Sequence, residues 1–297
     1  MDRILEMSAF VAVADAASFS AGAKTLGLSA STVTRSVAAL ETRLGARLLL
    51  RTTRSVRLTD AGRQFLEDAR RLLRDIEDAD QAVGNAAGRA RGVLRITAPI
   101  LFGEMHLAAV LREFLDLYPD VQARLMLVDR VINIVEEGID LAVRIGRFDD
   151  SSLSSIALGQ VQRMLVASPD YVARHGAPVH PSELGRHRIA QSIGNSASRE
   201  WHFRERGQPL SVTITPTLTV SSLRATIECA RQGWGLARVL SYQVREDLER
   251  GTLRGVLDAF EPAPLPVCLV FPPSRRPSAT LMHFVELASQ RLSAILA

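Results

Sequence analysis

The sequence is poor in the residues that build disulfide frameworks and thiolate metal sites. Only two cysteines, Cys229 and Cys268, occur in 297 residues, which excludes a disulfide-stapled fold and a cysteine-rich metal site. We expect both to be small core residues, the alternative being a redox sensor. The six histidines are scattered without ligand spacing, so we predict no metal site and no other cofactor.

Long apolar runs and the common catalytic motifs are also missing. No apolar stretch approaches the roughly 20 residues that span a membrane, and Asp2, Glu6 and Asp15 interrupt the apolar positions that a signal peptide needs. The chain contains no Gly-x-Ser-x-Gly, His-Glu-x-x-His, Gly-x-Gly-x-x-Gly or Cys-x-x-Cys motif. We therefore expect a cytoplasmic protein with no membrane partner that is not an enzyme.

Basic side chains are concentrated near the N-terminus. Residues 1–59 carry eight bases and four acids, and seven of these bases lie with a single acid between residues 24 and 57. The 205 residues from 93 onward are almost neutral. A basic module fused to a neutral body indicates a polyanionic partner, although a solvated basic face would have the same composition.

The first 45 residues predict three helices with a tight turn between the second and the third. Apolar residues recur at helical spacing over residues 4–16, and a short second helix ends at Leu26. The predicted caps and turn residues are Ser18 or Ser20, Gly27, Ser29 and Gly45. Two helices joined by a three-residue turn form the DNA-binding helix-turn-helix, whose second helix enters the major groove.

The third helix has one apolar face and one face of short polar side chains. Spacings of four, three and four residues predict a buried stripe, formed by Val33, Val37, Leu40 and Leu44. The outward face of its first half carries Ser31, Thr32, Thr34 and Arg35. Hydroxyls can bond phosphates or base edges and an arginine can bond guanine, so we predict DNA contacts from these residues and Ser29. An ordinary amphipathic helix is the alternative.

Arginines recur after Gly45 beside a short alternating segment. The residues Val56, Arg57 and Leu58 alternate in polarity, which predicts a small β-hairpin, or wing. We predict that Arg51, Arg54 and Arg57 contact phosphates or the minor groove.

Residues 1–62 resemble the DNA-binding domain of LysR-type transcriptional regulators. The most specific matches are the Ser-Phe-Ser at 18–20, Val33-Thr34-Arg35, and Leu58-Thr59 followed by Gly62. The family often has glutamine at the position of Ala30, so a common adenine contact is missing here.

The segment after the wing predicts a long linker helix, with Thr59 as its N-cap and Asp60 in its first turn. Apolar residues recur with spacings of four and three, which is typical of a coiled-coil seam. The seam consists of Phe65, Ala69, Leu72, Ile76, Ala79 and Val83. We expect this seam to pair two subunits, although packing on its own domain is the alternative. The resemblance implies that two subunits form a homodimer and that two dimers assemble into a homotetramer. The glycines at 84, 88 and 92 predict a hinge, so the linker spans 60–92.

The body, residues 93–297, alternates strands with helices and predicts an α/β fold with a largely parallel sheet. Predicted strands cover 93–98, 121–128, 139–145, 163–167, 211–220, 235–239 and 267–271. Predicted helices cover 107–114, 131–137 and 279–296. Segments 92–125, 135–153 and 167–184 resemble the LysR-type effector domain. That resemblance implies the fold of type 2 periplasmic binding proteins, with lobe I at 93–162 and 268–297 and lobe II at 163–267.

Ligands of open α/β sheets bind beyond the carboxyl ends of the strands, where helix N-termini attract anions. We therefore place a small-molecule effector in the cleft between the lobes. The predicted contact residues are Ile100, Leu101, Phe102, Arg144, Gly146, Gln191, Trp201, Ser221 and Ser222. Leucine at 101, where the family often has serine or threonine, cannot donate a hydrogen bond, so this half of the cleft either favours an apolar or aromatic ligand group or is vestigial. Arg144 is the best candidate partner for an anionic group, the alternative being a structural ion pair.

The sequence thus predicts an effector-responsive transcriptional regulator that binds an interrupted palindrome in double-stranded DNA as a dimer or a pair of dimers. RNA polymerase would be a further partner if the protein is an activator. A solute-binding protein would explain only the body, and an architectural DNA-binding protein without an effector would explain only the basic module.

Overall fold

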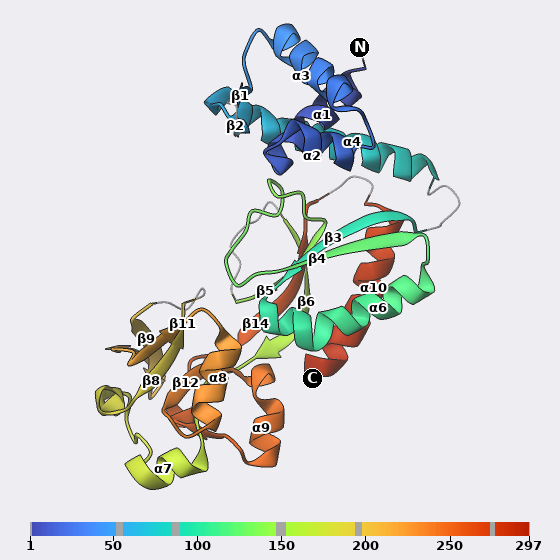
Figure 1. Ribbon diagram of the computed structural model, residues 1–297. Helices are drawn as coiled ribbons and strands as arrows, with labels where there is room; N and C mark the ends of the chain where they lie inside the picture. Colours follow the sequence, from blue (N-terminus) through green and yellow to red (C-terminus); the bar gives the residue numbers. More distant parts are fainter. Residues whose placement is uncertain are drawn as a thin grey trace. The chain divides into compact units, whose positions relative to one another are not determined.

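The computed structural model describes residues 2–51, 56–84, 90–146, 153–193, 198–273 and 277–296. It divides into two compact units, a head formed chiefly by residues 1–89 and a body that begins at Ala90. Figure 1 shows both units, with colours that run from blue at the start of the head to red at the end of the body.

Three helices build the head: α1 (Arg3–Ala16), α2 (Phe19–Thr25) and α3 (Ala30–Leu44). The predicted caps are confirmed, since the Ser18 hydroxyl accepts the N–H of Ala21 and the Ser29 hydroxyl accepts the N–H of Thr32 at 3.1 Å. Gly27 and Gly45 adopt φ near +65°, a conformation that L side chains disfavour. Local sequence signals therefore set both ends of the turn between α2 and α3.

The head encloses its own apolar core. Val33, Val37 and Leu40 of α3 are fully buried, as predicted, and pack with Phe10 and Val13 of α1. Leu44 is wrongly placed in this stripe: its side chain is 38% exposed because α3 ends there and the chain reverses at Gly45. The predicted wing is present as an antiparallel pair, β1 (Leu49–Arg51) and β2 (Val56–Leu58).

Helix α4 (Asp60–Gly84) begins where the Thr59 hydroxyl accepts the N–H of Gly62 at 2.8 Å. Its first turns pack on the head, where the ring of Phe65 lies 5.7 Å from that of Phe10. Ala69 has no exposed surface, so it belongs to the head core and is not available for the predicted seam. Leu72, one turn further along, is 43% exposed. The seam side chains of Ala79 and Val83 lie outside the described residues.

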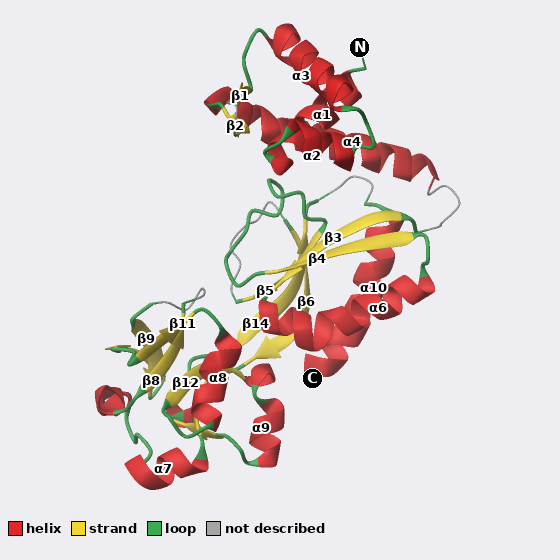
Figure 2. Ribbon diagram, viewed as in Figure 1, coloured by secondary structure: helices red, strands yellow, loops and turns green. Residues whose placement is uncertain are grey.

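The body has two lobes, each built on a five-stranded sheet (Figure 2). The first sheet has the order β4-β3-β5-β14-β6. Its strands are β3 (Gly92–Ala98), β4 (Val121–Leu127), β5 (Leu141–Ile145), β6 (Ser154–Val161) and β14 (Leu265–Phe271). Helical elements α5 (Ile100–Phe102), the π-helical turn Gly103–Leu107, α6 (Ala108–Leu117) and α10 (Ala279–Leu296) accompany this sheet.

The second sheet has the order β11-β8-β12-β7-β13. Its strands are β7 (Arg163–Ala167), β8 (Ile189–Ser192), β11 (Leu218–Val220), β12 (Leu236–Leu240) and β13 (Arg254–Val256). The same lobe contains the hairpin β9 (Glu200–Glu205) and β10 (Gln208–Thr213), and helices α7 (Pro169–His175), α8 (Leu223–Arg231) and α9 (Arg245–Arg250). The chain passes between the lobes twice, between β6 and β7 and between β13 and β14. These two connections are joined by a hydrogen bond in which the Gln162 side-chain amide donates to the Pro262 carbonyl at 2.8 Å.

Three predictions for the body were wrong. Both sheets are mixed, because β14 runs antiparallel to β5 and β6, and β7 runs antiparallel to β12 and β13. The segment 131–137 forms turns instead of a helix, since its β-branched residues disfavour helix and Ile132 and Ile134 are buried in a small separate cluster. The segment 211–220 contains parts of two strands, β10 and β11.

Among the described residues, no single helix is long and apolar enough to span a membrane. Helices α1 and α2 together have the length and apolar composition of a membrane span, but the chain bends by 120° between them.

Candidate DNA-binding surface and effector cavity

The outward face of α3 presents one cation among short hydroxyl side chains. Ser31 and Arg35 are exposed, and Thr32 and Thr34 are partly exposed. The Thr34 hydroxyl donates to the Ala30 carbonyl at 2.7 Å, so it can still accept a hydrogen bond, but its proton is already used. Arg35 is therefore the side chain of this face best suited to a charged or bidentate contact.

A cluster of hydroxyls covers the N-terminus of α3. The Ser29 oxygen, which caps the helix, lies 2.9 Å from that of Ser31 and 2.8 Å from that of Thr32. Ser29 therefore has a structural role in this helix as well as its predicted place at the DNA. The first N–H groups of a helix attract phosphate oxygens, so this end of α3 suits a nucleic-acid backbone.

The basic side chains of residues 1–59 fall into two groups. Arg43 pairs at 3.0 Å with Glu6, whose carboxylate is buried, so this arginine stabilises the head. The other group is exposed and forms no ion pair within the described part of the head: Arg3, Lys24, Arg35, Arg47 and Arg57. Arg54 and the side chain of Arg51, both predicted DNA contacts, lie outside the described residues.

A cavity of about 340 Å³ lies between the two lobes of the body. It opens at the carboxyl ends of strands, since Pro99 follows β3, Ile145 ends β5 and Ser192 ends β8. Its lining also includes Asp129, Arg163, Ala190, Gln191, Ser198, Glu200, Trp201, His202, Leu223, Arg238, Val239, Leu240, Tyr242, Gln243 and Leu265. The mixture of apolar walls with a few polar groups is typical of a small-molecule site.

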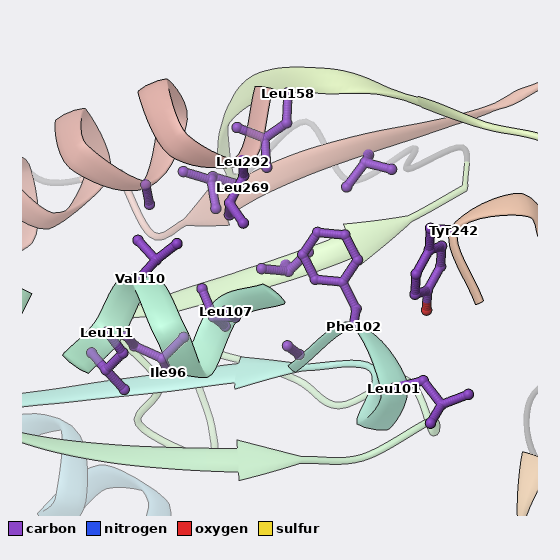
Figure 3. Close-up of a cluster of buried hydrophobic side chains, with 14 of the residues drawn as sticks. Ile96, Leu101, Phe102, Leu107, Val110, Leu111, Leu158, Tyr242, Leu269 and Leu292 are labelled. Carbon is purple, nitrogen blue, oxygen red and sulfur yellow. The ribbon is translucent and has the colours of Figure 1, made fainter. Parts of the chain in front are cut away.

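Two of the predicted effector residues, Gln191 and Trp201, line this cavity. Leu101 and Phe102 do not, since they are 5% and 0% exposed and belong to the lobe I core. Figure 3 shows the ring of Phe102 beside Tyr242, and their centroids are 5.4 Å apart. The chain does reach the cavity just after β3, at Pro99, but the side chains of Leu101 and Phe102 point into the protein.

The remaining predicted residues do not line the cavity, and Arg144, Gly146 and Ser222 have local structural partners. The Arg144 guanidinium donates to the Ile132 carbonyl at 2.6 Å, and the Gly146 N–H donates to the Pro266 carbonyl at 2.9 Å. Ser222 caps α8 by accepting the N–H of Ala225. Residues next to them in the chain line the cavity instead: Ile145 between Arg144 and Gly146, and Leu223 after Ser222. In the same way, Pro99 lines the cavity and Ile100 does not, and Ser221 is not part of the lining.

The N-terminus of α5 already holds an anion from the protein. The Ile100 N–H donates to a carboxylate oxygen of Asp129 at 3.0 Å. This position was predicted to attract an effector anion, and Asp129 occupies the donor instead.

Two cationic residues of the cavity were not predicted, Arg163 and Arg238. Arg238 stacks with its guanidinium carbon 5.0 Å from the ring centroid of Trp201 and 4.8 Å from that of Phe203. Burial lowers the pKa of Arg238 to about 10 and also lowers the pKa of Arg163. A sequence signal was present, because each arginine belongs to a short apolar strand segment, Arg163–Ala167 or Leu236–Leu240.

Comparison with known protein families accounts for both units. The family model described as the bacterial regulatory helix-turn-helix protein, lysR family, matches residues 4–63, and the LysR substrate binding domain matches residues 87–293. The chain belongs to the LysR family of transcriptional regulators.

Relatives of this LysR-type regulator match it over nearly its whole length. An HTH-type transcriptional regulator of Xanthomonas campestris is 34% identical, over 96% of this chain and 84% of the relative. The structure of CrgA, a LysR-type regulator from Neisseria meningitidis, matches with a TM-score of 0.62 and 28% identity, covering 97% of this chain and 98% of CrgA. The full-length Vibrio cholerae virulence activator AphB gives a TM-score of 0.64 and 25% identity, covering 95% and 97%.

These comparisons confirm the predicted fold class, a winged helix-turn-helix followed by a two-lobed α/β domain. The LysR-type regulator therefore combines a DNA-binding head with an effector-binding body, and its matching relatives are transcriptional regulators.

Proposed function

We propose that this regulator binds an interrupted palindrome in double-stranded DNA as a homodimer or a pair of dimers, and that a small molecule in the body cavity alters this binding. The protein would act in the cytoplasm, where its DNA is. Residues 1–59 read the DNA, residues 60–92 join two subunits, and residues 93–297 sense the effector.

The observation that carries the DNA contact is the exposed Arg35 on α3. It has no ion pair within the described residues and is flanked by hydroxyls short enough to let the helix approach a groove. We assign base or phosphate contacts to Ser31, Thr32, Thr34 and Arg35, and phosphate contacts to Arg51, Arg54 and Arg57 of the wing.

The observation that supports pairing is the apolar surface on α4 beyond the head core. Leu72 is exposed and Ile76 is partly exposed, at the four-residue spacing of a seam. A helix in this position would place two copies of α3 on one duplex, which suits a two-fold related pair of half-sites. Contact with RNA polymerase would follow if the bound site activates a promoter.

Effector control would act through the two lobes. A ligand that contacts both sheets stabilises one relative arrangement of the lobes over another, and only such a difference in affinity can shift the DNA-binding state. The cavity meets this condition because lobe I supplies Pro99 and Ile145 while lobe II supplies Gln191 and Trp201.

The DNA assignment is tested by replacing Arg35. Genomic fragments that the purified full chain selects should bind Arg35→Ala more weakly by about 1–3 kcal/mol, with random DNA much less affected. Arg204→Ala, which removes an exposed arginine from β9 of the body, is the matched control and should bind as the unaltered chain does. Equal losses on selected and random DNA would make Arg35 a phosphate contact, and no loss on either would remove it from the interface.

A further inference from the structure

Arg163 and Arg238 lie on the same face of neighbouring strands in the wall of the body cavity. In the antiparallel pair of β7 and β12, Arg163 is opposite Leu240 and Arg238 is opposite Leu165. Directly paired residues share a face, and so do residues two apart on one strand. The two arginines are therefore diagonal neighbours, and like charges in this arrangement repel each other.

The described residues do not neutralise this pair. Arg231 elsewhere in the same lobe shows full compensation, since its guanidinium donates to both oxygens of Asp247, at 2.6 and 2.7 Å. Neither Arg163 nor Arg238 forms an ion pair with a described carboxylate. Arg238 donates to the His202 carbonyl at 2.6 Å, while its buried Nε has no partner among the described residues.

The acidic side chain that acts electrostatically on both arginines is Glu261, which is adjacent in the chain to Pro262. Burial raises the pKa of Glu261 to about 7 against the attraction of Arg238 and Arg163. A carboxyl group that is half protonated near neutral pH leaves most of the two positive charges uncompensated. Leaving buried charge uncompensated is costly, so the site favours an anion from outside.

The rest of the cavity restricts what that anion can be. Asp129 already holds the helix N-terminus of lobe I, so a second anionic group has no matching donor there. Apolar walls formed by Ile145, Leu223, Val239 and Leu265 suit a hydrocarbon body. A volume of about 340 Å³ is at the small end for ligand pockets.

We propose that the body cavity binds a small organic monocarboxylate, with its carboxylate on Arg163 and Arg238 and its apolar body against the walls contributed by both lobes. This inference rests on the proposed sensing function of the cavity and names the chemical class of its ligand. The planar guanidinium groups offer paired N–H donors that match the two carboxylate oxygens.

The experiment compares acids with their neutral isosteres on the full-length protein. A set of small aromatic and aliphatic monocarboxylates, starting with benzoate and hexanoate, is matched one for one with the primary amides, and binding is followed by thermal shift and calorimetry. The expected result is that binding compounds come from the acids and that each matching amide binds about tenfold or more weakly. Binding confined to amides, equal binding of both members of a pair, or no binding acid in the set would overturn the proposal.

Variants connect that preference to the two arginines. Arg163→Gln should weaken the binding of a carboxylate by about 10- to 100-fold and leave the amide unchanged. Arg163→Lys should restore part of the affinity, and Arg204→Gln on the exposed hairpin is the control. Because Arg238 also packs on Trp201, Arg238→Lys is the gentler second variant, and operator binding without a compound checks that each variant folds. Carboxylate affinity that is unchanged in both Arg163→Gln and Arg238→Lys would overturn the assignment.

The same experiment separates this proposal from the one it rests on. An amide that alters operator binding, and loses this effect when Leu223→Trp fills the cavity, would reject the carboxylate class and keep the cavity as the sensor. If carboxylates bind through the arginines but never alter operator binding, the ligand class would stand and the proposed sensing function would fail.

Discussion

Arg35 in the head and Arg238 in the body are both arginines without an ion pair in the described structure, but their surroundings differ. Arg35 is exposed on α3, where water solvates its charge. Arg238 is covered by Trp201 and Phe203, and burial lowers its pKa to about 10. Exposed cations attract a polyanion through interactions that salt weakens, whereas a buried cation selects one anion that replaces its lost water. On the proposed functions, the two units would use the same side chain for two kinds of recognition.

The largest expected effect concerns the proposed pairing of two subunits through α4. Leu72→Asp places a charge on the exposed apolar surface of α4, and burying it at a subunit contact costs about 3 kcal/mol or more. We expect sedimentation to show dissociated protomers and operator affinity to fall by about 100-fold or more. Gln64→Asp adds the same charge at an exposed position of the same helix and should leave the dimer intact. An intact Leu72→Asp dimer would show that α4 does not pair the subunits through this face.

A smaller effect concerns the buried charges of the body. The folded-state pKa of Glu261, about 7, lies above its ordinary value of 4.5, so the folded protein binds this proton more tightly than the unfolded chain. The free energy of unfolding of the body should therefore fall as the pH rises from about 4.5 to 7, by on the order of 2 kcal/mol. Arg238, Arg163 and Asp258 are the charged groups that act on Glu261.

Urea unfolding at about pH 5 and about pH 8 measures this dependence, because both tryptophans, Trp201 and Trp234, belong to the body and report on it alone. Glu261→Gln should flatten the pH profile in this window. An unchanged profile in Glu261→Gln would assign the effect to other groups and weaken the contrast between the buried charges of the body and the exposed charges of the head.

The smallest expected effect concerns an arginine in the wing of the head. Arg57 is exposed on β2 of the wing, where we assign it to a phosphate. Arg57→Ala should reduce the slope of log affinity against log salt concentration by about 0.9 for each phosphate that the side chain neutralises, with equal effects on operator and random DNA. Anisotropy titrations over a range of salt concentrations measure this slope, with Arg204→Ala as the control. A slope that stays the same would remove Arg57 from the interface.

The head could be predicted from the sequence almost element by element, because its signals are local. Ser18, Ser29, Gly27 and Gly45 fix the ends of the helices through interactions within a few residues. Ala69 was assigned to the wrong surface, since the same spacing suits a core face and a seam, and only the packing of α4 on α1 decides between them.

The cavity was predicted less well, because its residues meet through strand register. Leu101 and Phe102 follow the right strand, but side-chain direction decides whether a residue lines a cavity or a core, and both face the core. Arg163 and Arg238 are 75 residues apart in the chain, and only the antiparallel pairing of β7 with β12 brings them to one face. The position of the cavity at strand carboxyl ends followed from the fold class, whereas its charged residues did not.

Recognition by two copies of α3 is tested most directly by selecting genomic DNA fragments with the purified full-length chain at moderate salt and aligning the bound sequences. We expect a shared interrupted inverted repeat whose half-sites lie on one face of the duplex and are protected together in a footprint. Bound fragments without a common motif, or with a single isolated half-site, would contradict recognition by two copies of α3.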